Sequence, residues 1–251
     1  MLTAERWRHI LDKIERHGTV QVTELVAELN VSESTIRRDL SELEKQEQLV
    51  RVHGGAESRF ETTTEPLFQD KLVENVEGKR SIAAYASQVI HDNEAIFIDA
   101  GTTTLAMAPF LKDKKGLKIV TNGLRQSDVF GEMGLDVSIL GGQIKTGTLA
   151  VVGTQAVRQL EQFYFDRVFL GMNGVEVSAG LTTPDIQEAI IKQTAIHQSR
   201  QAYVLVDSSK FNKTSFAKVA DLNHAIIFTD YLSPENAEKF EADAEIEEAS
   251  E

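Results

Sequence analysis

Beyond Arg80, six short apolar runs alternate with helical patterns, and this alternation constrains the fold more than any other feature of the chain. The runs are AIFID at 95–99, LKIVT at 117–121, DVSIL at 136–140, RVFLG at 167–171, AYVLVD at 202–207 and AIIFTD at 225–230. The helical patterns lie near residues 82–90, 103–111, 125–133, 155–163 and 185–199. Apolar strands that alternate with helices are typical of a mostly parallel sheet covered on both faces. The sequence therefore predicts an α/β domain over residues 80–232.

The first 57 residues follow a different pattern. Three stretches have apolar residues at helical spacing, with Thr3, Thr23 and Ser32 as the expected N-caps and Gly18 as the expected end of the first helix. Only about three residues separate the second helix from the third, as in a helix-turn-helix. The alternating stretch QLVRVHGGA at 48–56 predicts a two-stranded wing with a tight turn. We therefore predict a winged helix-turn-helix DNA-binding domain over residues 1–57.

Two further segments complete the predicted domain organisation. Residues 58–79 are polar and contain Glu65-Pro66, which breaks a helix, so we interpret them as a linker that leads into the second domain. Residues 233–251 are expected to form a C-terminal helix and an acidic tail. From Glu241 to Glu251 the chain has six acidic residues and no basic one, so the tail is expected to be solvated and frayed.

The composition of the chain limits its partners and its location. A formal net charge of −13 argues against a protein that coats nucleic acid or an anionic membrane by bulk electrostatics. Residues 1–56 hold 8 Lys/Arg and 10 Asp/Glu, a net charge of −2, which leaves −11 for the rest of the chain. The sequence contains no cysteine, no apolar run long enough to span a membrane and no signal peptide at its N-terminus, so we expect a cytoplasmic protein.

The third helix of the first domain is the predicted DNA-reading element, because in a helix-turn-helix its N-terminal side chains lie at the base edges of the major groove. Hydroxyl and guanidinium groups suit base edges and phosphates, so the predicted contacts are Ser32, Ser34, Thr35, Arg37 and Arg38, with Arg51 and His53 added by the wing. The alternative is that Arg37 and Arg38 belong to an ordinary solvated helix face. Since each module has few cations, we expect a homodimer or homotetramer that binds repeated half-sites in operator DNA.

The stretch AIFIDAGTTTLA at 95–106 runs from a strand into a helix and is a candidate phosphate-binding loop, because free N–H groups and threonine hydroxyls favour an anion. It lacks the Walker A and dinucleotide-binding patterns, so a nucleotide is not implied, and the alternative is a packing turn without a ligand. Loops at 121–123, 140–142, 171–174 and 207–211 also follow predicted strands, and the carboxyl ends of parallel strands meet along one edge. The predicted ligand-binding residues in these loops are Asp99, Gly101, Thr102, Thr103, Thr104, Asn122, Gly141, Gly142, Asn173, Gly174, Asp207 and Lys210.

Residues 22–56, VTELVAELNVSESTIRRDLSELEKQEQLVRVHGGA, resemble the winged DNA-binding unit of the deoxyribose-repressor (DeoR) family of bacterial regulators. The chain matches the family motifs S-x-x-T-I-R-R-D-L and H-G-G-A at residues 32–40 and 53–56. It departs from the family at Glu47, where a glycine usually precedes the wing, and this predicts a differently closed helix or local strain. Asp39 is expected to be a local ion-pair partner that holds an arginine in place.

The motifs of the second domain resemble, in the same order, the sensor domain of the DeoR family. They run from D-A-G-T-T at 99–103 through T-N-G, L-G-G, G-M-N-G and G-L-T-T to D-S-S-K at 207–210, so the resemblance extends to about Leu232. It implies a fold similar to ribose-5-phosphate isomerase and a repressor that a phosphorylated sugar releases from operator DNA. Within the family the chain is most similar to fructose-operon repressors of Gram-positive bacteria, which implies fructose 1-phosphate. Lactose phosphotransferase repressors come next, which implies tagatose 6-phosphate.

The alternative function is a sugar-phosphate isomerase with an accessory DNA-binding module. Aldose–ketose isomerisation needs a carboxylate base beside the C2 proton. Isomerases carry clustered aspartates in the segment that resembles FLGMNGV, whereas this chain has Met172, Asn173 and Gly174 there. We therefore predict that the chain has no catalytic residue, needs no cofactor and is not an enzyme.

Two further sets of residues bear on the predicted site. Glu188 lies on the helix after Thr182-Thr183 and is expected to contact a sugar hydroxyl. The alternative is a surface ion pair with Lys192, because residues four apart on a helix are neighbours. A metal site is not expected, because His91, His197 and His224 are isolated in the sequence.

Overall fold

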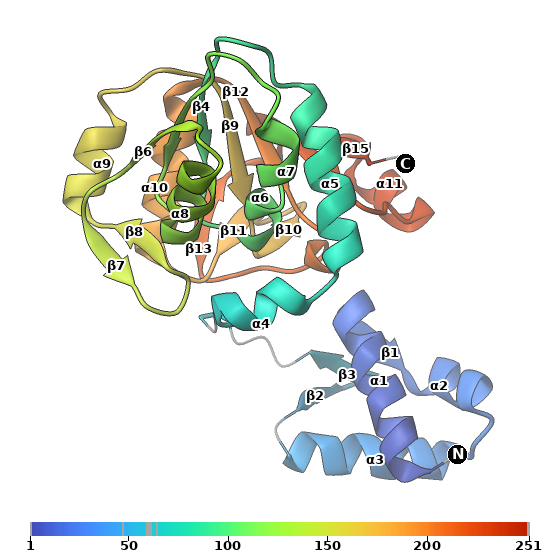
Figure 1. Cartoon of the computed structure of the whole chain (residues 1–251). Coiled ribbons are helices and arrows are strands. Elements are labelled where there is room, and N and C mark those ends of the chain that lie inside the picture. Colours follow the sequence, from blue (N-terminus) through green and yellow to red (C-terminus); the bar gives the residue numbers. More distant parts are fainter. Residues whose placement is uncertain (1, 47, 59–61, 64, 250–251) are drawn as a thin grey trace. The chain divides into compact units, whose positions relative to one another are not determined.

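The structure is a computed structural model that describes residues 2–46, 48–58, 62–63 and 65–249 (Figure 1). The chain divides into two compact units, Met1–Glu61 and Thr62–Glu251. Glu47, where the sequence departs from the DeoR pattern, lies outside the described residues. No helix within the described ranges is both long enough and apolar enough to cross a lipid bilayer.

The first unit is a winged helix-turn-helix, as predicted. Its helices are α1 (Thr3–His17), α2 (Val22–Leu29) and α3 (Glu33–Lys45). Its antiparallel sheet has the order β1-β3-β2, with β1 (Thr19–Gln21), β2 (Leu49–Val52) and β3 (Gly55–Ser58). The wing is therefore a β2–β3 hairpin to which β1 adds a third strand. The buried core of the unit includes Ile10, Leu25, Ile36, Leu40 and Leu43.

The helix boundaries follow only part of the predicted signals. Ser32 caps α3, because its Oγ accepts a hydrogen bond from Thr35 N (3.3 Å), and Gly18 ends α1 with φ +74°. The expectation that Thr3 and Thr23 are N-caps is wrong. Each lies inside its helix, because the extended residue that precedes the helix comes one or two positions earlier.

Two glycines make the tight turn of the wing possible. Gly54 has φ +84°, a conformation that glycine adopts without the steric cost of a side chain. A β-carbon at Gly55 would overlap the carbonyl oxygen of Val20 in β1. The turn therefore needs glycine once for its backbone conformation and once for the close approach of β1.

The second unit contains a seven-stranded sheet in which every neighbouring pair of strands is parallel, in the order β15-β14-β12-β9-β4-β5-β6. The six predicted runs form β4 (Ala95–Ile98), β5 (Lys118–Thr121), β6 (Asp136–Ile139), β9 (Phe165–Gly171), β12 (Ser199–Leu205) and β14 (Ile226–Thr229). The predicted parallel α/β fold is confirmed.

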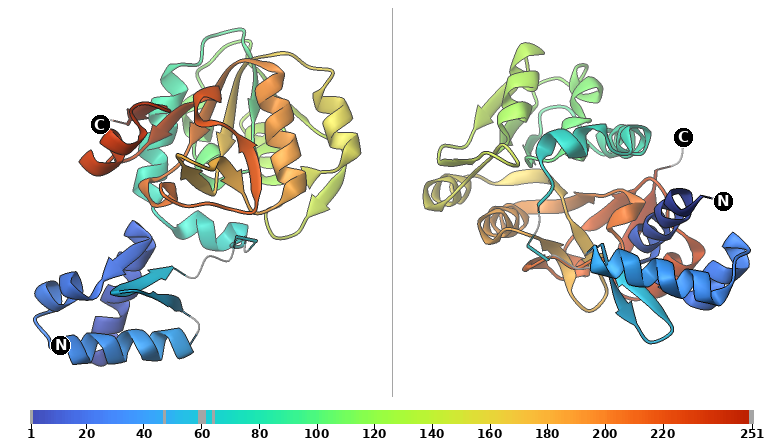
Figure 2. Two further views of the ribbon diagram at one scale, coloured as in Figure 1. Left: turned by 180° about the vertical axis from the view of Figure 1, so that it is seen from behind. Right: turned by 90° about the horizontal axis from the view of Figure 1, so that it is seen from below.

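Helices cover both faces of this sheet, as the views in Figure 2 show. One face packs against α5 (Val76–Gln88), α6 (Thr102–Leu105), α7 (Ala108–Leu111) and α8 (Leu124–Glu132), and the other against α9 (Thr154–Leu160) and α10 (Ile186–His197). Phe169 of β9 belongs to the first core, whereas its neighbours Val168 and Leu170 belong to the second. The single helix predicted at 103–111 is two short helices, α6 and α7.

The acidic tail forms regular structure, so the prediction of a frayed end is wrong. After α11 (Pro234–Phe240), β15 (Glu245–Glu248) pairs in parallel with β14 at the edge of the sheet. Ile246 packs on the core, and Tyr85 OH donates a hydrogen bond to Glu247 (2.8 Å). An edge strand leaves its charged side chains in solvent, so an acidic composition is compatible with this position.

Several short elements were not predicted. Strands β7 (Gln143–Lys145) and β8 (Ala150–Val152) form a hairpin, and β10 (Gly174–Glu176), β11 (Gly180–Thr183) and β13 (Ala217–Ala220) form a second small sheet. Short 3-10 helices lie at η1 (Ser208–Lys210) and η2 (Leu222–His224). The segment 58–79, interpreted as a linker, contains α4 (Phe68–Val73) and the start of α5. Both α4 and the β7–β8 hairpin contribute residues to the pocket described next.

Candidate functional site

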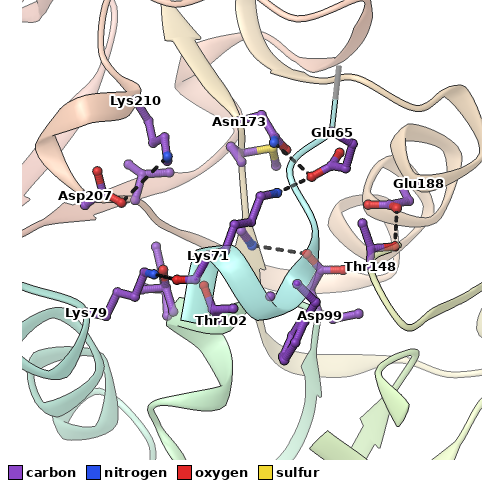
Figure 3. Close-up of a pocket in the computed structure, with 18 of the residues that line it drawn as sticks. Glu65, Lys71, Lys79, Asp99, Thr102, Thr148, Asn173, Glu188, Asp207 and Lys210 are labelled. Carbon is purple, nitrogen blue, oxygen red and sulfur yellow. Dashed lines mark hydrogen bonds and ion pairs between the residues drawn. The ribbon is translucent and has the colours of Figure 1, made fainter. Parts of the chain in front are cut away.

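A pocket lies at the carboxyl edge of the parallel sheet, where the loops after β4, β9 and β12 meet (Figure 3). The structure brings eight of the thirteen predicted ligand-binding residues to its lining: Asp99, Gly101, Thr102, Thr103, Asn173, Glu188, Asp207 and Lys210. These residues come from separate parts of the sequence, and they converge because each follows, or packs against, the end of a parallel strand. Their contact with a ligand stays a prediction.

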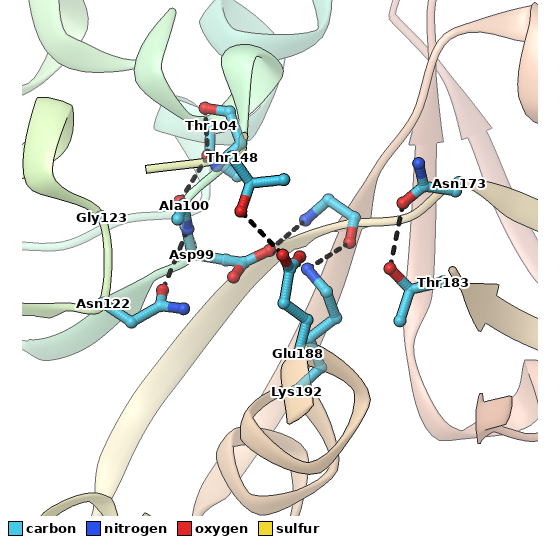
Figure 4. Close-up of polar contacts among 12 residues, drawn as sticks. Asp99, Ala100, Thr104, Asn122, Gly123, Thr148, Asn173, Thr183, Glu188 and Lys192 are labelled. Carbon is cyan, nitrogen blue, oxygen red and sulfur yellow. Dashed lines mark hydrogen bonds and ion pairs between the residues drawn. The ribbon is translucent and has the colours of Figure 1, made fainter. Parts of the chain in front are cut away.

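A buried ion pair between Asp99 and Lys192 ties the ends of two strands together (Figure 4). Lys192 Nζ also donates to the carbonyl of Gly171 (2.9 Å), and Gly171 N donates to Asp99 Oδ2 (3.2 Å). Burial lowers the pKa of Lys192, but the carboxylates of Asp99 and Glu188 outweigh this effect, so its pKa is raised. The lysine is therefore charged at neutral pH, and Asp99 anchors the end of β4 to that of β9.

Glu188 has different partners from the one its sequence spacing suggested. Lys145 Nζ and Thr148 Oγ1 each donate to Glu188 Oε1, both at 2.8 Å. Lys192 is engaged by Asp99, so the alternative of a surface ion pair between Glu188 and Lys192 is not what the structure shows. Among the described residues, nothing donates a hydrogen bond to Glu188 Oε2. That oxygen is available to a ligand hydroxyl.

Five predicted residues lie outside the pocket lining, and their contacts support the fold around it. The side chains of Thr104 and Asn122 hydrogen-bond to the backbone of the loop after β4, at 2.6 and 3.0 Å (Figure 4). Gly141 N donates to a glutamine side chain of α9 (2.8 Å). A β-carbon at Gly142 or Gly174 would crowd a backbone carbonyl. These residues shape and support the pocket loops, and the glycines allow close backbone packing.

Besides Lys192, three lysines line the pocket: Lys71, Lys79 and Lys210. The amine of Lys79 is buried and donates to the carbonyls of Glu74 (2.7 Å) and Lys71. Burial lowers the pKa of Lys79; Asp207 opposes this shift and Lys210 adds to it. Among the described residues, no group of three or more His, Asp or Glu side chains is arranged to hold a metal ion.

Five lining residues come from the segment that sequence reasoning assigned to a linker: Glu65, Phe68, Lys71, Glu74 and Lys79. Phe68 and Lys71 lie in α4, which spans six residues, and Glu74 is its C-cap. So short a helix gives no periodicity that distinguishes it from a polar connection. The apolar residues within this polar stretch are the signal that could have indicated a packed segment.

The predicted DNA-contacting side chains at the start of α3 differ in whether they already have partners within the protein. The Ser32 hydroxyl lies within hydrogen-bond distance of those of Ser34 (2.9 Å) and Thr35 (2.8 Å). Arg37 forms an ion pair with the glutamate one turn earlier (2.6 Å). Arg38 is exposed and makes no hydrogen bond or ion pair with any described residue. Arg38 is therefore the side chain of this helix that is most available to DNA.

Arg51 fastens the wing to α3. Its guanidinium donates to Ser41 Oγ (3.0 Å), to the carbonyl of Arg37 (3.3 Å) and to that of Gly55 (3.2 Å). Its predicted contact with DNA is compatible with this arrangement but must share the same group. His53 is exposed at the turn of the wing. Both assignments stay predictions.

Asp39 links α3 to α1 through a buried network. Its carboxylate pairs with the Arg6 guanidinium, whose terminal nitrogen lies 2.9 Å from Oδ1, and accepts a hydrogen bond from Trp7 Nε1 (2.9 Å). The hydrogen bond with Asp39 raises the pKa of Arg6 against the opposing effect of burial. The expectation that Asp39 holds an arginine is met, and the arginine comes from α1.

Comparison with known proteins gives matches over both units. Residues 6–62 match the DeoR-like helix-turn-helix domain, and residues 74–231 match the DeoR C-terminal sensor domain. The chain is 44% identical over 229 residues to the uncharacterised HTH-type transcriptional regulator FruR of Bacillus subtilis, with 91% of each protein covered. It is 34% identical over 247 residues to the lactose phosphotransferase system repressor of Staphylococcus epidermidis, which covers 96% of this chain and 98% of the relative.

Among solved structures, ribose 5-phosphate isomerase A of Methanocaldococcus jannaschii shares 15% identity and a TM-score of 0.42, over 55% of each chain. A score of this size assigns no function. The relatives compared by sequence are named as regulators of transcription and not as enzymes, in agreement with the prediction that this chain is not an enzyme. The chain belongs to the DeoR family of transcriptional regulators.

Proposed function

We propose that the protein represses a sugar-utilisation operon by binding operator DNA through α3, and that a phosphorylated sugar in the pocket releases it. The observation that carries this proposal is the division of the pocket into two sides. Figure 3 shows Lys79 and Lys210 at one end of the pocket and Glu188 at the other, with Lys71 between them beside Asn173. Lysine binds phosphate as a point charge, and carboxylate and amide side chains bind sugar hydroxyls.

The phosphate is assigned to the side formed by Lys79, Lys210 and the start of α6. Lys79 uses two of its three donor hydrogens on backbone carbonyls, which leaves one for an anion. The hydroxyls of Thr102 and Thr103 have no hydrogen-bond partner among the described residues. The backbone N–H groups at the start of a helix also lack intrahelical acceptors. Together these donors match the several oxygens of a phosphate group.

The sugar hydroxyls are assigned to Asn173 and Glu188. Asn173 Oδ1 accepts a hydrogen bond from Thr183 Oγ1 (3.0 Å), which orients Nδ2 toward the pocket as a donor. Glu188 offers Oε2 as an acceptor. Neither Asp99 nor Glu188 is a free base, because each carboxylate is paired with a lysine. This supports binding of a sugar phosphate without its isomerisation.

The preferred effector is fructose 1-phosphate, and tagatose 6-phosphate is the second candidate. The relative with 44% identity carries the name FruR, and the relative with 34% identity is named as a lactose phosphotransferase system repressor. The proposal extends these names to the present chain through overall similarity. We also propose that the working form is a homodimer or homotetramer, because one helix-turn-helix module with few cations binds DNA weakly.

Binding of the effector is expected to stabilise the protein against heat. A ligand at about 100 times its dissociation constant adds about 2.7 kcal/mol to the free energy of unfolding, which is a readily measured shift in Tm. Thermal-shift measurements with fructose 1-phosphate, tagatose 6-phosphate and the matching unphosphorylated sugars check this. A shift with the free sugar that equals the shift with its phosphate would contradict the assignment of the lysine side to phosphate.

Arg38→Ala is expected to weaken operator binding by about 1–3 kcal/mol, or about 5- to 150-fold, because Arg38 is exposed near the start of the reading helix. Lys45→Ala is the matched control, because this substitution also removes one positive charge, but at the far end of α3. Fluorescence anisotropy with an operator fragment selected from random DNA measures both variants. Equal losses in the two variants would show that α3 contributes only general electrostatic attraction.

A further inference from the structure

Residues 65–74, named the strap, form one wall of the effector pocket and include α4 (Figure 3). Glu65, Phe68 and Lys71 line the pocket. The strap also has an exposed apolar side, at Leu67, Leu72 and Val73. Because an isolated helix of six residues is unstable in water, the contacts that the strap makes with the pocket determine its position.

Glu65 occupies the Asn173 amide, which the proposed function gives to the effector, together with the neighbouring amine of Lys71. Its Oε1 pairs with the Lys71 amine and accepts a hydrogen bond from Asn173 Nδ2 (3.1 Å). Figure 3 shows both contacts inside the pocket. Glu65 thus places a carboxylate between a lysine and a hydroxyl-binding amide, where a phosphorylated sugar would place its own oxygens.

The position of Glu65 is also incompletely satisfied. Its Oε2 is buried and has no hydrogen-bond partner among the described residues. A buried carboxylate oxygen without a partner is unfavourable, because the water that solvated it has not been replaced. Glu65 is therefore held less favourably than a ligand that satisfies every polar atom of the site. Replacement of the Glu65 carboxylate by such a ligand is favourable.

We propose that Glu65 is a built-in competitor of the effector, and that a sugar phosphate displaces it from Asn173 and Lys71. The inference rests on the proposed function and adds the step by which occupancy of the pocket reaches the DNA-binding unit. Glu65 and Pro66 follow the first unit closely in the chain, and proline fixes its own φ, so a shift of Glu65 redirects the connection. The phosphate attracts Lys71 by its charge, and a sugar hydroxyl accepts the Asn173 donor.

The rest of the strap keeps its own attachments during this exchange. Phe68 N donates to the carbonyl of Gly147 in the β7–β8 turn (2.9 Å), and the Lys79 amine holds the carbonyl of Glu74 (2.7 Å). Phe68 itself is buried. The displacement is therefore confined to residues 65–67, ahead of α4.

The test compares Glu65→Ala, Glu65→Gln and the wild type in the full-length protein. Calorimetric titration measures the Kd of fructose 1-phosphate or tagatose 6-phosphate, whichever stabilises the wild type, and anisotropy measures operator affinity with and without it. If Glu65 occupies the pocket nine times in ten, its removal tightens effector binding about tenfold. The effect of the sugar phosphate on operator affinity falls toward a factor of 1. Glu65→Gln keeps a hydrogen-bonding side chain without the charge for Lys71 and is expected to fall between.

Asp70→Asn is the matched control, because it removes one negative charge from α4 at an exposed position outside the pocket lining. Its effector Kd is expected to stay at the wild-type value. If the wild type binds the sugar phosphate and neither Glu65 variant binds it more tightly than the wild type, the competitor role is overturned and the proposed function stands. A wild-type protein that binds neither sugar phosphate would overturn the proposed function, and the competitor role with it.

Discussion

Replacing Lys192 with methionine is expected to lower the free energy of unfolding of the second unit by about 3–5 kcal/mol, the usual cost of removing one partner of a buried ion pair. Methionine keeps much of the length and apolar volume of lysine, but it leaves Asp99 only 2% exposed and without its cation. The contact between Lys192 and the carbonyl of Gly171 is lost as well. Urea denaturation followed by far-UV circular dichroism measures the change.

The double variant Asp99→Asn/Lys192→Met separates the contribution of the ion pair from the cost of leaving one buried charge without a partner. A buried pair replaced by neutral side chains of similar size is often close to neutral in stability, so the double variant is expected to recover part of the loss. A Lys192→Met protein as stable as the wild type would show that the pair does not hold β4 to β9. Equal losses in the single and double variants would assign the effect to packing rather than to charge.

The effect of Lys192→Met is expected to be constant between pH 6 and pH 9. Burial lowers the pKa of Lys192, but the carboxylates of Asp99 and Glu188 raise it by more than burial lowers it. The pKa of the folded state therefore lies above that of the unfolded state. A raised lysine pKa contributes stability that is fully present below the unfolded pKa, about 10.4, and is lost as the pH rises through the folded pKa. Denaturation of the wild type and the variant at several pH values checks this sign.

The parallel sheet explains why much of the pocket could be predicted from the sequence. Asp99, Asn173 and Asp207 are far apart in the chain, but each lies close to the end of an apolar run. Once the runs are taken as parallel strands, their carboxyl ends meet at one edge, and the side chains there converge. The convergence follows from the direction of the strands alone and does not depend on their register.

The partners of these side chains could not be predicted in the same way. Helical spacing left a surface pair between Glu188 and Lys192 as an alternative. The structure instead pairs Lys192 with Asp99, and Glu188 with Lys145 and Thr148. Those contacts depend on the depth of α10 against the sheet and on a hairpin that the sequence did not reveal. A pair of side chains four residues apart on a helix contributes only about 0.2–0.5 kcal/mol, so tertiary packing determines the partners here.

The strap was missed for a different reason. Glu65, Lys71 and Lys79 belong to a polar segment with a proline, which composition assigns to a linker. Their role arises from contacts with Asn173 and with backbone carbonyls, and no pattern within the segment encodes those partners. The prediction for the acidic tail was wrong because its charges are compatible both with a disordered end and with an edge strand.

Asp39→Ala is expected to remove about 3–5 kcal/mol from the stability of the first unit and to leave the second unit folded. The change strands the buried Arg6 guanidinium and the Trp7 indole N–H, which both depend on the Asp39 carboxylate. At about 0.05–0.15 kcal/mol per residue, a unit of this size has about 3–9 kcal/mol to lose, so the variant is close to unfolding at 25 °C. Operator binding is therefore expected to disappear.

The measurement is specific to this unit, because Trp7 is the single tryptophan of the chain. Its fluorescence in urea reports the unfolding of the first unit, while the thermal shift with the sugar phosphate reports the second. Asp12→Ala removes an exposed acid from the same helix bundle and is expected to change stability by less than about 0.5 kcal/mol. Loss of sugar-phosphate binding in Asp39→Ala would mean that the two units do not fold separately. Retained binding without operator binding would show that Asp39 supports DNA recognition through the fold of α1 and α3, with no contact of its own with DNA.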